Sequence, residues 1–252
     1  TRYSDVYARD ALHPARVRPG DRADIPPAAI LAKPHQRHLT LPQRREIIEA
    51  YYASLSYMDA QVGRLLDALE LLKLSENTVV LFVSDHGYML GDHGMWQKSA
   101  LFEPSVRVPL IIAAPGMSTA GKSTEALAEM VDIYPTLAGL CGLTPPDHVR
   151  GIDLNPVLRD PGKTVREAAF SVTNSRVRPP GRKGQSLGHT IRTDRFRYTE
   201  WGDGELGREL YDHGSDPQEL TNLANDPAHA DTVRRLQSLL QETRRRTGDS
   251  GA

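Results

Sequence analysis

Five apolar residues run directly into a short polar segment in Val79-Val80-Leu81-Phe82-Val83-Ser84-Asp85-His86-Gly87. An unbroken apolar run of this length predicts a strand that is buried on both faces. Asp85 and His86 follow at its carboxyl end, where open α/β sheets bind their ligands. A carboxylate suits a hard cation and an imidazole a borderline one, so this pair is a candidate metal site. The dipeptide alone leaves an alternative open, in which Asp85 caps the next turn and His86 is a surface residue.

The composition is that of an ordinary soluble globular protein. With 252 residues, the chain forms one large domain or one domain with an appendage. Because 31 basic residues balance 32 acidic ones, no overall field favours nucleic acid as a partner. The sequence contains no apolar run long enough to span a bilayer, and its single cysteine, Cys141, excludes an internal disulfide. The first residues lack a start methionine and a secretory signal, as in a fragment, so bacterial cytoplasm, periplasm and lysosome all stay compatible.

A long amphipathic helix is predicted immediately before the strand. Thr40 caps its first turn, Gln43 occupies the capping-box position and Pro42 is tolerated at the start. A helix that leads into a buried strand forms half of a βαβ unit. The apolar residues of the helix recur at steps of three or four and form one stripe that faces a core: Ile48, Tyr51, Leu55, Met58, Val62, Leu65 and Leu69.

Residues 1–160 are predicted to form the main α/β part of the chain. The first forty residues show no sustained period, and so long an irregular segment indicates function or wrapping around the domain. A second buried strand is expected at 108–114, and a short helix from near Asp132 to Leu140.

Residues 161–252 are predicted to form a smaller carboxyl-terminal subdomain. Its strands are short, and the one at 195–201 alternates polar with aromatic residues, as a half-buried antiparallel strand does. The expected strands lie at 168–172, 190–192, 195–201 and 209–212, and a last helix at 227–245.

The loop after the first strand gathers charged and metal-binding side chains. Asp85, His86, Asp92, His93 and Lys98 lie within fourteen positions. These residue types suit an oxyanion site, in which Asp and His hold a cation and Lys adds a positive charge with three donors. Two alternatives stay open: Lys98 is a solvated surface residue, and His93 is a loop histidine bonded to the backbone.

The chain resembles the sulfatase family in many motifs, which occur in the family's order over nearly the whole sequence. The pattern is closest to the iduronate-2-sulfatase and choline-sulfatase branches, and it covers the carboxyl-terminal portion of such proteins. The motifs are Tyr51-Tyr52-Ala53-Ser54-Leu55, Ser84-Asp85-His86-Gly87, Gly91-Asp92-His93-Gly94-Met95-Trp96-Gln97-Lys98, Arg107-Val108-Pro109-Leu110-Ile111, Val131-Asp132-Ile133-Tyr134-Pro135-Thr136-Leu137, Arg192-Thr193-Asp194-Arg195-Phe196-Arg197-Tyr198 and Glu209-Leu210-Tyr211-Asp212.

The resemblance implies an alkaline-phosphatase-like α/β fold, with part of a sheet sandwiched by helices and a small antiparallel α+β carboxyl-terminal subdomain. It implies hydrolysis of sulfate esters around one divalent cation, usually Ca²⁺, with Mg²⁺ or Mn²⁺ as alternatives. Asp85 and His86 would be metal ligands, Lys98 would contact the sulfate as a catalytic and substrate-binding residue, and Tyr88 would lie at the pocket mouth. His93 would support catalysis.

Two further residues are candidates for the site. Arg107 falls in a matching motif and would have a supporting role. His189, just ahead of the Arg192 strand, is a candidate substrate-binding residue. The expected substrate is a sulfated small molecule or sugar. A nearby group of basic residues could meet such a sugar, but a solvated surface is the favoured interpretation: Arg176, Arg178, Arg182, Lys183 and Arg192.

The chain also departs from the family's pattern. Family members carry, in an amino-terminal half, a pair of Asp ligands and a Cys-x-Pro-Ser-Arg motif whose Cys becomes formylglycine, the source of the hydrated nucleophile. Here the look-alike around Pro104-Ser105 has Phe102 at the nucleophile position, and Lys33-Pro34-His35 imitates a sulfate-binding motif by coincidence. We therefore expect a carboxyl-terminal part that exposes a large apolar face, is inactive and poorly soluble alone, and has the amino-terminal half as its partner.

The sequence leaves three rival interpretations open. The same superfamily includes phosphodiesterases and phosphonate monoester hydrolases with similar Asp-His pairs and lysines. The chain could instead be a separate non-catalytic subunit that retains the fold. It could also be one product of a cleaved protein whose two halves stay assembled.

Overall fold

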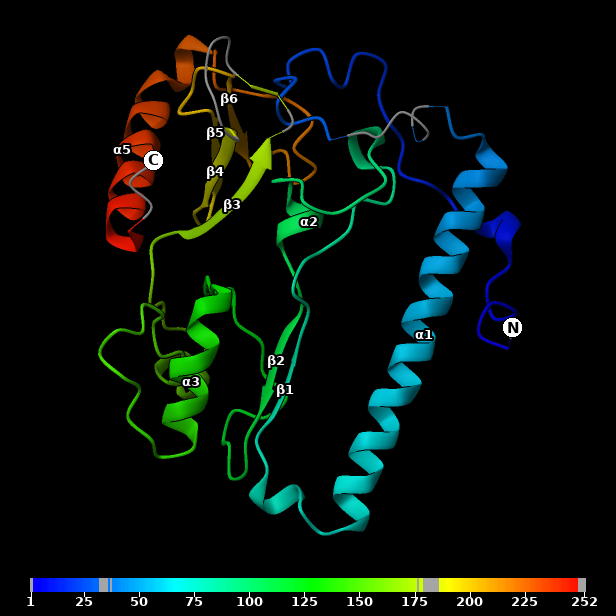
Figure 1. The fold of residues 1–252 in the computed structure, drawn as a ribbon, viewed down its shortest axis with the longest axis vertical. Coiled ribbons are helices and arrows are strands. Elements are labelled where there is room, and N and C mark those ends of the chain that lie inside the picture. Colours follow the sequence, from blue (N-terminus) through cyan, green and yellow to red (C-terminus); the bar gives the residue numbers. More distant parts are fainter. Residues whose placement is uncertain (1, 32–35, 37, 176, 179–185, 249–252) are drawn as a thin grey trace.

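The computed structural model describes residues 2–31, 36, 38–175, 177–178 and 186–248 (Figure 1). Within these residues the strands form two antiparallel sheets. The smaller sheet pairs β1 (Val80–Val83) with β2 (Leu110–Ala113). The larger sheet contains four strands in sequence order, at or beside the four predicted positions: β3 (Ala169–Ser175), β4 (Ser186–Arg192), β5 (Phe196–Trp201) and β6 (Arg208–Asp212).

Helix α1 (Leu41–Leu71) is the helix predicted before the first strand, and it is 31 residues long. Thr40 N donates to Gln43 Oε1 at 2.8 Å and Gln43 N donates to Thr40 Oγ1 at 3.4 Å, so the predicted capping box is present. Pro42 lies in the first turn, where its missing N–H costs no intrahelical hydrogen bond. A short 3-10 helix (Ser75–Asn77) then leads into β1.

The apolar stripe of α1 and the first strand are less buried than the sequence predicts. Ile48 is buried, whereas Leu55 and Leu65 are 43% and 69% exposed, and Ile111 of β2 is 60% exposed. Every residue of β1 is half-exposed. Figure 1 shows why: α1 stands apart from the β1–β2 pair along most of its length, and no described element fills the space as a covering layer. The prediction of a strand buried on both faces is therefore wrong within the described residues, while the expected exposed apolar face is present.

The pairing of β1 also differs from the expectation of a βαβ unit. Its neighbour β2 is antiparallel, with Val80 opposite Ala113 and Val83 opposite Leu110. No parallel pair of strands occurs in the part of the chain that the structure describes.

The irregular amino-terminal segment packs against both the loop after β1 and the larger sheet. Ile25 and Ala28 share one core with Met89 of the loop, Phe102 and Trp201 of β5. The segment therefore wraps around the domain, as its length predicts, and links the loop to the sheet.

Strands β4 and β5 in the middle of the larger sheet are buried on both faces, whereas the edge strand β3 is partly exposed. Helix α5 (Ala230–Thr247) lies along one face in Figure 1, and its Leu236 and Leu240 pack in one cluster with Tyr198 of β5. Arg197 precedes Tyr198 and faces the opposite way, yet both side chains are buried. The half-buried strand predicted at 195–201 is therefore wrong in its exposure, because different parts of the chain cover the two faces.

The other helices are short. Helix α2 (Glu103–Val106) precedes β2, and α3 (Ile133–Leu140) follows a 3-10 turn (Met130–Asp132) close to the predicted start near Asp132. Helix α4 (Asn155–Arg159) lies before β3, and a 3-10 turn (Pro227–His229) leads into α5. None of the helices in the described ranges combines the length and hydropathy that a membrane-spanning segment needs. The boundary between 1–160 and 161–252 stays a prediction.

Candidate active site

The loop after β1 folds back on itself. Met89 N donates to the Gln97 carbonyl at 3.0 Å, and Gly91 N donates to the Met95 carbonyl at 2.9 Å. Gly91 sits at the turn with φ of 113°, a backbone conformation that favours glycine. This pairing returns the chain to the end of β1 and delivers Lys98 to the residues that follow the strand.

Three of the predicted site residues lie together at the end of β1. Lys98 Nζ is 3.0 Å from His86 Nε2, and Asp85 Oδ2 is 3.7 Å from the same ring nitrogen. The side chains of Asp85 and His86 are 83% and 37% exposed. The structure therefore presents a carboxylate, an imidazole and an ammonium group to solvent at one point.

The imidazole of His86 is oriented as a metal ligand would be. Its Nδ1 lies 2.9 Å from the Gly87 carbonyl, which can only accept, so Nδ1 carries the proton of the neutral ring. The lone pair of Nε2 then faces Lys98 and Asp85, and it is the pair that a cation would take. Two donors are fewer than the roughly six to eight that Ca²⁺ binds, so Asp85 and His86 fit one side of a metal shell.

Tyr88 and His93 occupy different places around this loop. The ring of Tyr88 packs 5.5 Å from the ring of Tyr51 on α1, and its hydroxyl donates to the Trp96 carbonyl. His93 is 4% exposed, and its Nδ1 lies 3.1 Å from Asp21 Oδ2 of the amino-terminal segment. The structure therefore buries His93 and bonds its ring to a side chain rather than to the backbone.

The other candidates make contacts with residues other than Asp85, His86 and Lys98. His189 is buried within β4, and its ring stacks on Phe170 at 6.1 Å. Arg107 is exposed and lies 3.8 Å from Glu103. Arg192 also pairs with Glu103, while Arg178 is exposed. The look-alike motif at 33–35 and the basic positions 176, 182 and 183 lie outside the described residues.

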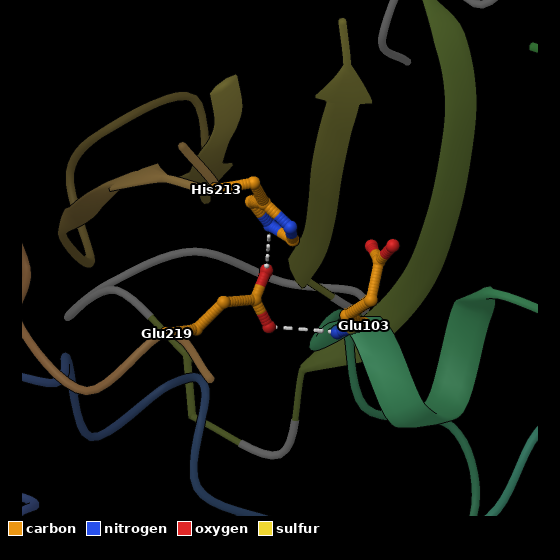
Figure 2. Close-up of side chains that lie close together, drawn as sticks. All are labelled: Glu103, His213 and Glu219. Carbon is orange, nitrogen blue, oxygen red and sulfur yellow. Dashed lines mark hydrogen bonds and ion pairs between the residues drawn. The ribbon is translucent and has the colours of Figure 1, made fainter. Parts of the chain in front are cut away.

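A second cluster of chemistry-bearing side chains lies next to α2, and sequence reasoning missed it. Glu103, His213 and Glu219 each place one potential ligand atom within 4.8 Å of the others (Figure 2). Glu219 Oε1 accepts from His213 Nε2 at 3.0 Å, and its Oε2 accepts from Glu103 N at 2.7 Å. Arg197 donates to both carboxylates, to Glu219 through Nε at 2.5 Å and to Glu103 through Nη2.

This second cluster is a buried ion-pair network. Burial acts to raise the pKa of Glu219, but the charge of Arg197 and the hydrogen bond from His213 outweigh it and lower that pKa below its ordinary value. Because Arg197 and Arg192 already balance the two carboxylates, a cation would meet positive charge there. The sequence feature that could have indicated this buried cluster is Arg197 itself, a charged residue between the aromatic residues of a strand.

Two family models match this chain. The model described as "Sulfatase" matches residues 7–143, which include the whole loop from Asp85 to Lys98. The model described as "N-sulphoglucosamine sulphohydrolase, C-terminal" matches residues 91–246. This chain belongs to the sulfatase family. The two matches overlap and together span both predicted units of the chain.

Curated sulfatases from bacteria and animals are similar to this family member. A "Sulfatase" of Formosa agariphila is 31% identical over 96% of this chain and 46% of its own length. The mouse iduronate 2-sulfatase is 32% identical over 77% of this chain and 46% of its own length. The choline-sulfatase of Rhizobium meliloti is 36% identical over 71% of this chain and 33% of its own length. The predicted likeness to the iduronate-2-sulfatase and choline-sulfatase branches is confirmed, and the chain spans less than half the length of these curated relatives.

Solved structures agree on the fold of the sulfatase chain. A protein solved in complex with its substrate D-glucosamine-2-N,6-O-disulfate superposes with a TM-score of 0.75 at 30% identity, over 83% of this chain and 43% of that one. The phosphonate monoester hydrolase of Silicibacter pomeroyi reaches a TM-score of 0.85 at 26% identity, over 97% of this chain and 52% of that one. The predicted alkaline-phosphatase-like fold class is confirmed.

Proposed function

We propose that this chain supplies one side of the active site of a sulfatase, a sulfuric ester hydrolase. The observation that carries the proposal is the convergence at the end of β1, where His86 Nε2 lies 3.0 Å from Lys98 Nζ and 3.7 Å from Asp85 Oδ2. An ammonium beside a carboxylate and an imidazole suits a tetrahedral anion that is also bound by a divalent cation.

Each of the three side chains has a distinct role. Asp85 and His86 hold the cation, which polarises the sulfate when it is bound. Lys98 donates to the sulfate oxygens and balances the negative charge that accumulates there during cleavage. Ca²⁺ is the ion that the resemblance to sulfatases implies, with Mn²⁺ and Mg²⁺ as the alternatives.

The remaining parts of the site are proposed to lie outside this chain. The expected nucleophile is a formylglycine hydrate that attacks sulfur, and its precursor motif is absent from these 252 residues. The partner of the chain is accordingly an amino-terminal half of the same protein. The short span of the chain along its relatives supports this arrangement.

The substrate is proposed to be a sulfated small molecule or a sulfated sugar. The relative solved with a disulfated glucosamine supports a sugar. Tyr88 is a candidate for the pocket mouth because it lies two residues beyond His86 and its ring is half-exposed beside Tyr51.

Hydrolysis of phosphonate monoesters is the second candidate function. The phosphonate monoester hydrolase of Silicibacter pomeroyi superposes on 97% of the chain with a TM-score of 0.85. Phosphonate esters are also tetrahedral anions, which Lys98 and a divalent cation would bind in the same way. The groups at the end of β1 therefore serve either substrate class.

A comparison of substrates in the full-length protein tests the proposal. We expect 4-nitrophenyl sulfate to be turned over with a higher kcat/KM than 4-nitrophenyl phenylphosphonate. Lys98→Ala should lower the sulfate kcat/KM by about 100- to 1,000-fold, as the loss of a charge-stabilising donor does. Lys122→Ala is the matched control, because Lys122 is exposed in a polar loop away from the motif.

Each other outcome has a defined meaning. A preference for the phosphonate would replace the sulfatase proposal by the second candidate. Turnover of neither substrate would favour a non-catalytic subunit. Near-normal sulfate turnover by Lys98→Ala would remove Lys98 from the site.

A further inference from the structure

Helix α2 holds the backbone that follows the proposed metal ligands. Gly87 N donates to the Ser105 carbonyl at 2.8 Å, and Tyr88 N donates to the Pro104 carbonyl at 3.0 Å. A Cβ atom at Gly87 would overlap the Pro104 carbonyl oxygen, so the two backbones are in direct contact. The position of α2 therefore fixes the chain one residue beyond His86.

Side chains from the carboxyl-terminal part fix α2 in turn. Glu219 Oε2 accepts from the Glu103 N–H at the start of α2 at 2.7 Å, which Figure 2 shows as a dashed line. Arg197 bridges both carboxylates, since its Nε donates to Glu219 Oε1 at 2.5 Å and its Nη2 donates to Glu103. The side chains of Arg197 and Glu219 are 2% and 1% exposed. Removing this guanidinium would leave two carboxylates with much of their charge uncompensated in the interior.

Arg197 is itself anchored in a rigid part of the fold. It lies in β5, which is hydrogen-bonded to β4 on one side and to β6 on the other. Its planar guanidinium donates in two directions at once, which the single ammonium of a lysine cannot reproduce in the same geometry. Arg197→Lys therefore keeps the charge and loses the bridge.

We propose that Arg197 is a positioning residue for the metal-binding end of β1. By holding Glu103 and Glu219 together, it keeps α2 against Gly87 and so sets the direction in which Asp85 and His86 leave the strand. The link to the metal rests on the proposed function. The link from Arg197 to Gly87 rests on the contacts alone.

Another buried arginine in the chain provides a matched control. Arg166 also bridges two carboxylates, with Nη1 2.7 Å from Glu129 Oε1 and Nη2 on Asp132. Its side chain is 5% exposed, but its partners lie in the turn before α3 and accept from the backbone of Phe170 and Ile152. Arg166→Lys should destabilise the protein to a similar degree as Arg197→Lys without reaching the end of β1.

The experiment compares the two variants in the full-length protein. Amide hydrogen exchange at Gly87 and Tyr88 reports the contact with α2, and calorimetric titration with Mn²⁺ and with Ca²⁺ reports the metal ligands. Arg197→Lys is expected to raise exchange at both amides about tenfold and to weaken cation binding about tenfold, as the loss of an outer-shell partner does. Arg166→Lys is expected to change neither quantity, although both variants lower Tm. Glu219→Gln keeps the side-chain volume and is a second variant with the same expectation, for use if Arg197→Lys does not fold.

Equal exchange at Gly87 and Tyr88 in the two arginine variants would overturn the proposal, whether exchange is raised in both or unchanged in both. Asp85→Ala separates this result from the proposed function. If Asp85→Ala leaves cation binding intact, the metal assignment is wrong, and the exchange data alone then decide the positioning role.

Discussion

Lys98 Nζ lies 3.0 Å from His86 Nε2, although twelve positions separate the two residues in the sequence. The ammonium donates to the lone pair that a cation would use, so Lys98 and the metal compete for the same nitrogen. A cation bound at Nε2 would leave Lys98 free of the ring and available for an anion. This competition gives a test that does not depend on turnover.

Removing Lys98 should strengthen cation binding while it weakens catalysis. Lys98→Met deletes a positive charge and a competing donor beside Nε2, and we expect the Kd for Mn²⁺ to fall by about threefold to tenfold. Asp85→Ala should abolish binding of the same ion. Calorimetric titration of the full-length protein measures both changes.

Lys122→Met is the control for Lys98→Met, since it removes the same charge from an exposed loop. Weaker Mn²⁺ binding by Lys98→Met would contradict the competition. Unchanged binding by Asp85→Ala would remove Asp85 from the metal site.

The groups around β1 could be predicted because their information is local. Thr40 and Gln43 lie three positions apart and form their capping box without help from the rest of the fold. The glycines between His86 and Lys98 allow the chain to reverse. The reversal brings the ammonium group of Lys98 back to the imidazole of His86. Short-range spacing therefore carried the prediction that these two side chains share one site.

The contacts that fix this group could not be predicted, because they join distant positions. Glu103 meets Glu219 across 116 positions, and His93 meets Asp21 across 72. Neither pair has a local sequence pattern that would predict the contact. The alternating polarity of the strand at 195–201 likewise does not indicate that both of its faces are covered. The predicted burial of β1 and α1 was wrong for the same reason. An apolar pattern indicates that a segment needs a covering layer, but it does not identify the segment that provides this layer.

This chain alone is expected to be inactive and to self-associate. Leu65 and Ile111 are 69% and 60% exposed, and large apolar side chains left open to solvent favour association. Light scattering during gel filtration should give a mass above that of one chain, and Leu65→Glu should shift it toward the monomer. A monodisperse unmodified chain, or its turnover of 4-nitrophenyl sulfate, would contradict this expectation.

Gly87→Ala should destabilise the protein, because the new methyl group would overlap the Pro104 carbonyl oxygen of α2. A backbone shift of this kind typically costs about 1–3 kcal/mol. Gly63→Ala is the control, since a Cβ at Gly63 meets nothing within 4 Å and lies inside α1, where alanine favours the helix by roughly 1 kcal/mol. The midpoint of urea unfolding should therefore fall for Gly87→Ala and rise for Gly63→Ala. Equal shifts of the two midpoints would show that α2 yields to the methyl group.

Stability should fall as the pH rises from 4.5 to about 8, owing to Glu209. Burial raises the pKa of Glu209 to about 7 from its ordinary value of 4.5, although Trp201 Nε1 and the Tyr211 hydroxyl donate to the carboxylate at 2.6 and 2.8 Å. Between these two pH values Glu209 loses its proton in the unfolded chain and keeps it in the folded chain. The contribution of the protonated carboxyl group to the free energy of unfolding is therefore complete below pH 4.5 and is lost as the pH rises through 7. The difference of about 2.5 pH units corresponds to roughly 3 kcal/mol.

Glu209→Gln isolates this contribution from the other titrating groups. The amide is neutral at every pH and can still accept from Trp201 and pair with Tyr211, so it imitates the protonated carboxyl group. We expect wild type and variant to have similar unfolding free energies near pH 4.5 and the variant to be more stable by roughly 3 kcal/mol near pH 8.5. Urea unfolding at a series of pH values measures the difference directly. If that difference did not change with pH, Glu209 would be ionised in the folded protein throughout, and the donors from Trp201 and Tyr211 would outweigh its burial.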